Sequence, residues 1–308
     1  MKFKKEQKIL DIGGVKVGGQ PGELPTVLIG SVFYSKHKIV KDSKQGIFDK
    51  KKIGILFKKT KYMSEKTGNP FIVDIEAFSK RAVEKYIDFV SENTNVPFLV
   101  NSGDISVRLH GIKYAAEKGL TERAIYTSIN FKVREEEISS LKEAGIKSAL
   151  IQAFNPKNLL PEGMSKIMKE NNGKEGLLMT ALRAGIEKPL LLAPVLDVPS
   201  ISYGVKGVYI LKEEFGLPTG IPPVGVVSIW TRGDKAKDLG DLTKKICEAS
   251  VAGFCPYIGS DFIHFGALRK AEIIFPAVAI NDAILAYGSR IDGIKIKTKN
   301  HPLYKIFR

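Results

Sequence analysis

The 308-residue sequence predicts an α/β fold of the (β/α)8 class, the TIM barrel. Short apolar segments alternate eight times with amphipathic helical patterns over roughly 250 residues, which is the usual length of such a barrel. No G-x-G-x-x-G follows the first apolar segment, so the fingerprint of a dinucleotide-binding open sheet is missing. Because 44% of the residues are hydrophobic, the chain can bury a large core, and an open doubly wound sheet is the second choice.

Eight segments are expected to be strands because they are short, apolar and bounded by turn residues. They comprise residues 26–33, 70–76, 97–102, 123–130, 148–154, 189–195, 217–224 and 261–267. The seventh contains "GIPPVG", which is too rich in proline for a regular central strand. We therefore expect this strand to be the least regular of the eight.

Helical patterns lie between these strands. Residues 77–93 repeat apolar side chains every three or four positions, and residues 133–145 end on Gly145, where a left-handed C-cap is expected. We expect one barrel domain over residues 1–308. Residues 1–25 form its glycine-rich lead-in, and "GGVKVGGQPGELP" within it indicates a hairpin or lid at the mouth or base of the barrel.

The formal net charge of +15 is compatible with nucleic acid, an anionic membrane, an acidic protein or a polyanionic cofactor as a partner. The lysines are spread along the chain, and no aromatic-interleaved RNA-recognition stretch accompanies them. We favour a lysine-rich surface and expect no nucleic-acid partner. An acidic protein partner remains compatible with this interpretation.

The sequence also bears on location. The start, "MKFKKEQKILDIGG", has no apolar stretch long enough for a signal peptide, and no segment reaches about 18 unbroken apolar residues. Cys247 and Cys255 form neither a disulfide framework nor a CxxC metal clip. We expect a cytoplasmic protein that does not itself span a membrane.

In a (β/α)8 barrel the active site lies at the C-terminal ends of the strands. The side chains expected there are Ser31, Phe33, Tyr34, Asp74, Glu76, Asn101, Ser102, Asp104, Ser128, Asn130, Gln152, Asn155, Asp197 and His264. The sequence contains no HExxH, no His/Cys cluster and no P-loop, so neither a catalytic metal nor a nucleoside triphosphate is expected. This set suits a flat, amide-rich heterocycle, because amides donate and accept while carboxylates accept paired N–H donors.

Three side chains allow two interpretations. His37, in "SKHKIV", is more often a surface-loop histidine than a proton donor at such a position. Arg232, beside Trp230, is a candidate contact for a cofactor phosphate or carboxylate. His264 lies in an otherwise apolar strand, so it either points into the barrel mouth or is a satisfied core side chain.

Several segments carry a family resemblance. They are "GGVKVGGQPGELPTVLIGSVFYSKHKIVKDSKQGIFDK", "MSEKTGNP", "YIDFV", "RAIYTSIN", "FNP", "GLPTG" and "HPLYKIF". Together, and in this order, they resemble the H subunit of tetrahydromethanopterin S-methyltransferase (MtrH) over nearly the whole chain. The long N-terminal block is the specific part, whereas "FNP" alone would mean little. The resemblance implies a (β/α)8 barrel like that of pterin-dependent methyltransferases.

The resemblance further implies a reaction and its partners. A methyl group would pass from N5 of methyl-tetrahydromethanopterin, or a related tetrahydropterin, to the cob(I)amide of a corrinoid on a separate protein. This is one-carbon chemistry of archaeal methanogenesis. The implied partners are a corrinoid protein or other subunits of a methyltransferase complex, with a homodimer peripheral to a membrane complex. Because cobalt(I) is the nucleophile, the protein has mainly to make N5 a better leaving group.

Asn130, at the end of "RAIYTSIN", has two interpretations. It can cap the following turn, which is the usual role of an asparagine at a strand end. It can also polarise N5 with its amide, which makes it the catalytic candidate. The predicted substrate-binding residues are Asp74, Asn101, Ser102, Asp104, Ser128, Gln152, Asn155 and His264.

The chain departs from the family pattern at two strand ends. Asn101, in "LVNSGD", stands where the family has an acid that would accept the pyrimidine N3–H and 2-amino group. In "LLLAPVLDVP" a leucine replaces the family's aspartate, with Asp197 displaced. A second hypothesis is therefore a non-catalytic or re-specialised paralogue that docks on a corrinoid protein, with a different methyl donor or none.

Overall fold

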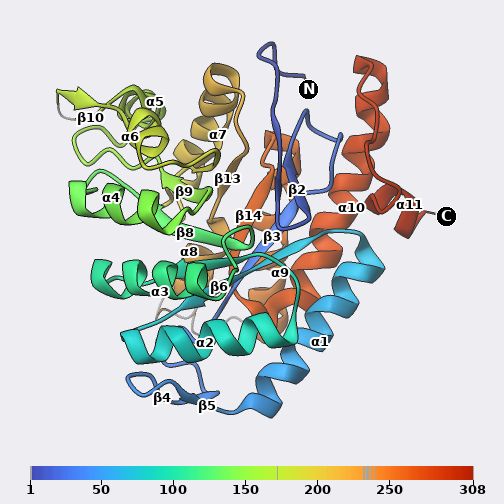
Figure 1. Ribbon diagram of the computed structural model, residues 1–308. Coiled ribbons are helices and arrows are strands. Elements are labelled where there is room, and N and C mark those ends of the chain that lie inside the picture. The colour runs from blue at the N-terminus through green and yellow to red at the C-terminus, as the bar shows by residue number, and fades with distance from the viewer. Residues whose placement is uncertain are drawn as a thin grey trace.

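A computed structural model of the chain describes residues 2–171, 173–231, 233, 236, 238 and 240–307. Within these residues, eight parallel strands form a closed barrel in the order β12-β13-β14-β3-β6-β7-β8-β9, and β12 pairs with β9 to close the ring. Helices surround the barrel on its outside (Figure 1). The predicted (β/α)8 class is confirmed, and the open sheet is not formed.

Each barrel strand overlaps one of the eight predicted segments. The barrel strands are β3 (Val27–Val32), β6 (Phe71–Glu76), β7 (Phe98–Asn101), β8 (Ala124–Ile129), β9 (Ser148–Gln152), β12 (Lys188–Leu192), β13 (Thr219–Ile221) and β14 (Phe262–Ala267). Two-stranded antiparallel pairs are formed by β1 (Ile9–Ile12) with β2 (Val15–Gly18), β4 (Val40–Asp42) with β5 (Ile47–Phe48), and β10 (Glu170–Asn171) with β11 (Lys174–Glu175).

The helices follow the strands in the expected alternation. They are α1 (Lys50–Thr67), α2 (Lys80–Asn93), α3 (Ile105–Glu117), α4 (Glu135–Ala144), α5 (Pro161–Lys169), α6 (Leu177–Arg183), α7 (Ile201–Phe215), α8 (Pro223–Trp230), α9 (Asp241–Gly253), α10 (Ala271–Ser289) and α11 (Pro302–Ile306), with 3-10 turns η2 (Cys255–Ile258), η3 (Leu268–Lys270) and η4 (Arg290–Asp292). The side chain of Ser79 caps α2. Gly145 ends α4 with a φ of 67°, as the pattern predicted.

The seventh strand is shorter than predicted. Residues 217–224 were expected to be extended, but β13 covers only Thr219–Ile221. Pro222 and Pro223 lack the N–H groups that a ladder needs, and Pro223 instead begins α8, where a first-turn proline is tolerated.

Strand alternation divides the core into two parts. Ile29, Ile72, Leu99 and Ile125 face the inside of the barrel and form one buried cluster. Side chains on the opposite face of the strands pack against the surrounding helices in a larger cluster, which includes Tyr126. Because both faces of every strand are covered, the strands are continuous apolar runs in the sequence.

The glycine-rich lead-in forms a plug at the base of the barrel. Ile12 of β1 and Val17 of β2 belong to the inner cluster, together with Val27 at the start of β3. Gly18 has a φ of 110°, and a Cβ there would overlap the carbonyl oxygen of Lys8. The hairpin therefore lies at the base, and not at the mouth.

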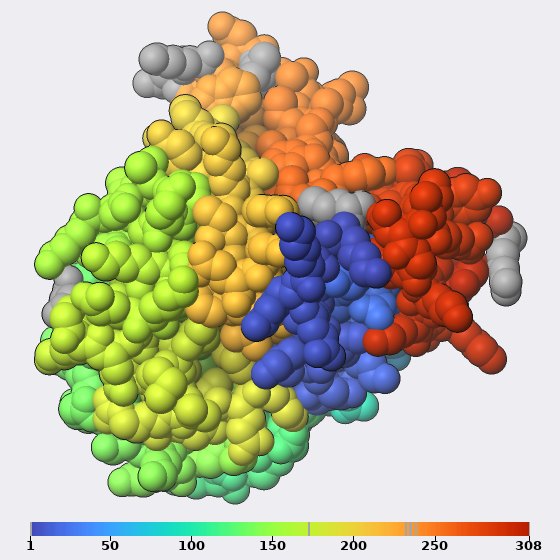
Figure 2. Space-filling view, turned by 90° about the horizontal axis from the view of Figure 1, so that it is seen from above, coloured from blue at the N-terminus to red at the C-terminus, as the bar shows by residue number. Residues whose placement is uncertain are grey.

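A buried ion pair holds this lead-in against the barrel. Lys212 of α7 has no exposed surface, and its Nζ lies 2.6 Å from Asp261 and 3.0 Å from the carbonyl oxygen of Gly19. In Figure 2 the N-terminal segment, in blue, accordingly lies between the gold α7 region and the red C-terminal region. Ser289 of α10 adds a hydrogen bond to the carbonyl oxygen of Pro21 on the red side.

Helix α10 is a long and largely apolar helix of the barrel wall. Among the described residues, the segment Leu268–Asp292 is the one helical stretch long and apolar enough to cross a membrane by length and composition. Half of its apolar window is buried inside the fold, where Ile274, Phe275 and Val278 join the outer core.

Asp282 of α10 lies in the interior. Its carboxylate accepts hydrogen bonds from the backbone N–H and hydroxyl of Thr26 and from the amide of Asn69, at 2.6–2.9 Å. Burial raises the pKa of Asp282 to about 6, against the opposing effect of these hydrogen bonds. The folded state therefore holds this proton more tightly than the unfolded chain does.

Asp282→Asn is expected to change how stability depends on pH. Between pH 4 and pH 7 the wild-type free energy of unfolding loses about 2 kcal/mol through this group, because a raised pKa favours folding only while the carboxyl is protonated. The amide variant lacks that loss, so it gains about this much relative to wild type as the pH rises. Urea unfolding of both proteins at pH 4, 5, 6 and 7 measures the difference. An Asp282→Asn effect that is constant across this range, like that of the exposed control Asp241→Asn, contradicts the assignment.

Candidate active site

The inner face of the barrel changes from apolar to polar toward the mouth. On each of six strands, the residue two positions after the inward-facing apolar residue is polar and faces inward as well. We call these six residues the polar layer. The apolar residues that precede them are Ile29, Ile72, Leu99, Ile125, Leu150 and Phe262. The polar layer consists of Ser31, Asp74, Asn101, Thr127, Gln152 and His264. Strand pairing supports this grouping, because Ser31 lies opposite Asp74 and Asn101 opposite Thr127.

Asp74 is the centre of the polar layer. Its Oδ2 accepts hydrogen bonds from the hydroxyl of Ser31 at 2.7 Å and from the amide of Asn101 at 3.3 Å, and lies 2.9 Å from Nε2 of His264. Asp74 is fully buried, and its Oδ1 has no hydrogen-bond partner within the described part of the chain. Strands β3, β6, β7 and β14 are thus joined at one carboxylate, which has one acceptor left over.

Two groups near Asp74 hold protons more tightly than usual. Burial lowers the pKa of His264, but the hydrogen bond and negative charge of Asp74 outweigh this effect and the pKa is raised. Burial and the charge of Asp74 also raise the pKa of Glu76, the next inward-facing residue of β6. About a quarter of the His264 side chain is exposed, so this ring connects the buried carboxylate with the mouth.

The loop after β3 contacts Glu76, whose carboxylate accepts a hydrogen bond from the backbone of Ser35. The backbone N–H of Phe33 donates to Nδ1 of His37 at 3.1 Å, and the His37 ring stacks on Tyr34 at 4.3 Å. Burial, with the positive charge of Arg269, lowers the pKa of His37 to about 4. His37 is therefore a buried, neutral loop anchor, and its interpretation as a surface histidine is wrong.

Asn130 is engaged in its own turn. Its Oδ1 accepts the backbone N–H of Lys132 at 2.9 Å, and its Nδ2 donates weakly to the carbonyl oxygen of Ser128 at 3.3 Å. The side chain is only partly buried, so the amide remains near the surface of the mouth. These contacts support the capping role and leave the amide N–H groups with one long hydrogen bond.

Ser128 lies at an irregularity in β8. Thr127 pairs with Leu150 and Ile129 pairs with Ile151, so Ser128 is an extra residue opposite the β8–β9 ladder. Thr127, not Ser128, continues the inward face that starts at Ile125. Sequence reasoning missed Thr127, although the two-residue alternation from Ile125 indicates it, and its hydroxyl has no partner among the described residues.

Ser102 and Asp104 belong to the support behind the site. Asp104 is exposed and caps α3 by accepting the backbone N–H of Ser106 at 2.8 Å. Ser102 is buried, and its carbonyl oxygen accepts Nη1 of Arg108 at 2.6 Å. Arg108 also donates a hydrogen bond to the hydroxyl of Tyr126, and this hydroxyl donates to the carboxylate of Glu137. The start of the β7–α3 loop at Ser102 is therefore supported by a buried polar network.

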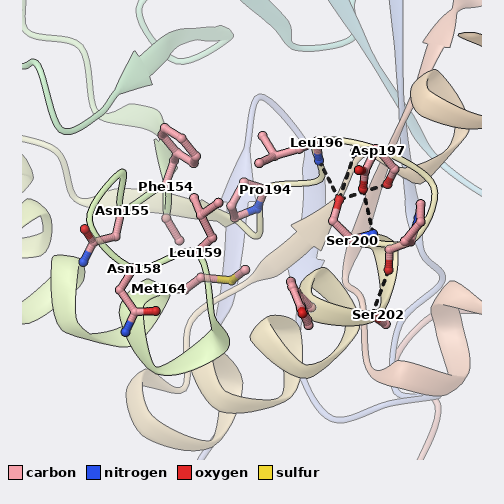
Figure 3. A pocket seen from close by; sticks show the side chains of 13 residues that line it. Phe154, Asn155, Asn158, Leu159, Met164, Pro194, Leu196, Asp197, Ser200 and Ser202 are labelled. Atoms are coloured by element: carbon pink, nitrogen blue, oxygen red, sulfur yellow. Dashed lines mark hydrogen bonds between the residues drawn. The ribbon is translucent and has the colours of Figure 1, made fainter.

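The other predicted residues lie on the opposite side of the mouth. Gln152 ends β9 opposite Leu192 of β12, and Asn155 follows in the β9–α5 loop, where its Oδ1 accepts the backbone N–H of Lys157. Asn155 and Asp197 both line a cavity of about 400 Å3 between the β9–α5 and β12–α7 loops (Figure 3). Asp74, Asn101 and His264 are thus brought together, whereas Asn155 and Asp197 are not part of their hydrogen-bond network.

No group of three or more His, Cys, Asp or Glu side chains within the described ranges is arranged to hold a metal ion. Arg232 lies outside the described residues. The arrangement around Asp74 offers one carboxylate oxygen without a partner among the described residues, beside an amide and an imidazole, and such a set suits the N–H groups of a flat nitrogen heterocycle.

Solved structures show a related fold. A dihydropteroate synthase from Yersinia pestis, solved with a sulfonamide drug complex, has a TM-score of 0.60 at 12% identity, and the match covers 90% of this chain and 98% of that one. A dihydropteroate synthase from Xanthomonas albilineans has a TM-score of 0.57 at 11% identity, covering 91% and 99%. At these identities the likeness concerns the fold alone.

Sequence relatives are much closer. The H subunit of tetrahydromethanopterin S-methyltransferase from Methanopyrus kandleri is 37% identical over 97% of both chains. The H subunit of a putative methyltransferase, mtx, from Methanosarcina barkeri is 36% identical over 98% of both. The family model "Tetrahydromethanopterin S-methyltransferase MtrH subunit" matches residues 5–297. The resemblance read from the sequence is confirmed, and the chain belongs to the MtrH family of methyltransferase subunits.

Proposed function

We propose that this chain moves a methyl group from N5 of methyl-tetrahydromethanopterin, or a closely related tetrahydropterin, to the cob(I)amide of a corrinoid carried by a partner protein. The observation that carries the proposal is the buried carboxylate of Asp74 beneath the barrel mouth, whose Oδ1 has no hydrogen-bond partner among the described residues. In a family named for tetrahydromethanopterin, that oxygen suits an N–H donor on the edge of a pterin ring.

The reaction determines what the protein has to supply. The bond between the methyl carbon and N5 breaks, and a bond between carbon and cobalt forms from the electron pair of cobalt(I). N5 keeps the electron pair of the broken bond and gains a proton. A hydrogen-bond donor or acid facing N5 therefore lowers the barrier, while the protein needs no nucleophile of its own.

Two neighbouring groups are suited to hold that proton. The pKa values of His264 and Glu76 are both raised. For His264, burial lowers the pKa, but the hydrogen bond and the charge of Asp74 outweigh this effect. For Glu76, burial and the charge of Asp74 both raise the pKa. His264 is the better candidate to face the ligand because part of its ring is exposed at the mouth. We assign it the acid role, with Asp74 fixing the imidazole.

The polar contacts also suggest how the ring is oriented. Ser31, Asp74, Asn101 and His264 are joined on β3, β6, β7 and β14, whereas β12 presents Leu192 and β13 is followed by Pro222. We propose that the hydrogen-bonding edge of the pterin faces Asp74 and Asn101. Thr127 and Gln152 would then contact the other side of the ring, with Asn130 above it directing an amide N–H toward N5. Ser128 would act through its backbone carbonyl, which contacts the Asn130 amide.

Ser102, Asp104 and Asn155 are proposed to act at a greater distance. The contacts of Ser102 and Asp104 favour holding the β7–α3 loop, which positions Asn101. Asn155 belongs to the cavity wall beyond Gln152. The alternative of a non-catalytic or re-specialised paralogue is not favoured, because the family match extends over nearly the whole chain.

The acceptor is proposed to approach the open end of the barrel. A corrinoid protein has to bring its cobalt to the methyl group, and the strand ends that carry the polar layer form the only end of the barrel not plugged by the described β1–β2 hairpin. The relatives are named as subunits, which supports a multi-subunit assembly in this case as well. We propose a cytoplasmic position at the periphery of a membrane complex.

Anaerobic mixing with cob(I)alamin and methyl-tetrahydromethanopterin tests the function, with the corrinoid absorbance following methylation of cobalt. Turnover by the wild-type protein is expected, and Asp74→Ala is expected to lower kcat/KM by about 100-fold or more through loss of the anchoring carboxylate. Asp241→Ala, at the exposed start of α9, is the control and should keep full activity. Absence of turnover with methyl-tetrahydromethanopterin and with methyl-tetrahydrofolate would overturn the proposal.

Two substitutions at Asn130 separate its capping from its catalytic role. Asn130→Asp keeps the oxygen that accepts the Lys132 N–H but loses the amide donor, whereas Asn130→Ala loses both. If the amide acts on N5, both variants lose activity by about 10- to 100-fold and only the alanine variant lowers the melting temperature. An aspartate variant with wild-type kcat and an alanine variant whose activity falls in step with its stability would leave only the capping role.

We propose a homodimer formed along α10. The outward face of this helix carries Ile280, Ile284, Tyr287 and, just beyond its end, Ile291, which are 45–92% exposed. Residues 273–289 contain no lysine, arginine or glutamate, in a chain with a net charge of +15. Arg290 lies over the Tyr287 ring at 5.0 Å, at the end of this stripe. A two-fold interface pairs a patch with itself, so a stripe that is apolar along most of its length lets two copies meet with little charge repulsion.

Ile284→Glu is expected to shift this dimer to monomer, because the two-fold axis brings both introduced charges into one apolar interface. Light scattering coupled to size exclusion measures the mass at micromolar concentration. Tyr62→Glu on α1, where the tyrosine is 57% exposed, is the matched control and should leave the mass unchanged. A wild-type protein that is monomeric under these conditions contradicts the proposal.

A further inference from the structure

The cavity beside the polar layer has no role in the reaction described above. Its walls come from the β9–α5 loop with α5 and from the β12–α7 loop with α7. In Figure 3 Asn155 and Asn158 lie on one side and the Asp197–Ser200 turn on the other, with Leu159, Met164 and Pro194 between them. A volume of about 400 Å3 is within the range of small-ligand sites.

This cavity begins where the polar layer ends. Gln152 is the last inward-facing residue of β9, and Ala153 and Phe154 directly after it line the cavity. The ring of Phe154 packs edge-on against Phe131 at 5.6 Å, and Phe131 follows Asn130 in the chain. A ligand whose ring lies on the polar layer can therefore extend past Gln152 and Phe154 into the cavity.

The lining selects an uncharged ligand group. The chain has 48 lysine and arginine residues, yet none of the residues around the cavity is basic. Its one ionisable acid, Asp197, accepts the backbone N–H of Ser200 at 2.9 Å, and this turn lowers the pKa of the carboxyl through the hydrogen bonds from Ser200. Phosphate and carboxylate groups would find no positive partner among the described lining residues, and the lysines nearest in the chain, Lys157 and Lys166, line the adjoining cavity that shares Asn155 and Asn158.

Apolar side chains at the rim are left uncovered. Leu159, Leu196 and Tyr203 are 45%, 56% and 43% exposed, and each lines the cavity. Covering such side chains with an aromatic or aliphatic group removes apolar surface of both partners from water. The hydroxyls of Ser200 and Ser202 are occupied by local hydrogen bonds at this rim, which leaves mainly apolar contact for a ligand.

The wall is also held in place before any ligand arrives. Met164 of α5 packs where a side chain on Gly207 of α7 would lie, so a Cβ at Gly207 would overlap the methionine sulfur. The two helices can approach closely only because this position is glycine. A preformed wall lowers the ordering cost of binding.

We infer that this cavity is a subsite for the uncharged aromatic or aliphatic segment that directly follows the ring in the substituent of the methylated pterin. The inference rests on the proposed function, because it assigns the same donor a second point of attachment. The ring is held by hydrogen bonds at Asp74, and the substituent is held by apolar contact with Leu159, Leu196 and Tyr203.

Two methyl donors and one rim variant test the subsite. Methyl-tetrahydromethanopterin carries a long substituent, whereas 5-methyl-6,7-dimethyl-tetrahydropterin has the methylated ring without one. Leu196→Asp places a charge at the exposed rim and is expected to raise KM for the long donor by about tenfold or more, with KM for the short donor unchanged. Leu182→Asp on α6, where the leucine is 61% exposed and outside the cavity, should change neither value.

The outcomes separate this inference from the proposed function. If Leu196→Asp changes KM equally for both donors, or for neither, the subsite is refuted while methyl transfer stands. If it raises KM for the corrinoid acceptor instead, the cavity receives the partner protein and not the donor. If the wild-type protein transfers a methyl group from neither donor, the proposed function fails. Calorimetric titration of each donor into the wild-type protein and into Leu196→Asp then still decides whether Leu196 distinguishes the long donor from the short one.

Discussion

The buried carboxylate of Asp74 is the interaction on which the site depends. It joins four strand ends by accepting from Ser31 and Asn101 and contacting His264, and it does so at a position with no exposed surface. An ionised carboxylate without partners would cost several kcal/mol at such a depth. The donors around Oδ2 offset that cost, and the same charge keeps His264 protonated to a higher pH. The carboxylate of Asp74 therefore both holds the strand ends of the barrel mouth together and raises the pKa of His264.

Much of this arrangement follows from the sequence through simple geometry. The alternation of short apolar strands with helices predicted the barrel, and the barrel placed Asp74, Asn101 and His264 at one end, where hydrogen bonds join them. Strand pleating also decides which face of the strand each side chain points to, because every second residue after an inward-facing apolar residue faces inward again. The same rule indicates Thr127, which shows that the information was present in "AIYTSI".

The features that could not be predicted depend on local backbone geometry and on loops. The irregularity at Ser128 breaks the alternation of β8, so the residues after it cannot be assigned to a face by counting. His37 was expected at the surface because a short polar loop usually is, but the loop folds back and the ring accepts the backbone N–H of Phe33. The cavity likewise lies between the β9–α5 and β12–α7 loops, which are some forty residues apart in the chain. No local sequence pattern indicates that these two loops lie side by side.

Three aspartates in the interior show how stability and function differ in one barrel. At the base, both oxygens of Asp261 are bonded to Lys212 or Thr219, and both oxygens of Asp282 accept hydrogen bonds from Thr26 or Asn69. At the mouth, Asp74 has all its partners on Oδ2 and none of the described residues on Oδ1. A carboxylate that only stabilised the fold would gain by satisfying both oxygens, as the two at the base do. The oxygen of Asp74 that has no partner among the described residues is thus a cost to the fold that a ligand N–H would remove, and this is the physical reason to propose Asp74, in preference to the better-satisfied acids of the barrel, as the residue that binds the donor ring.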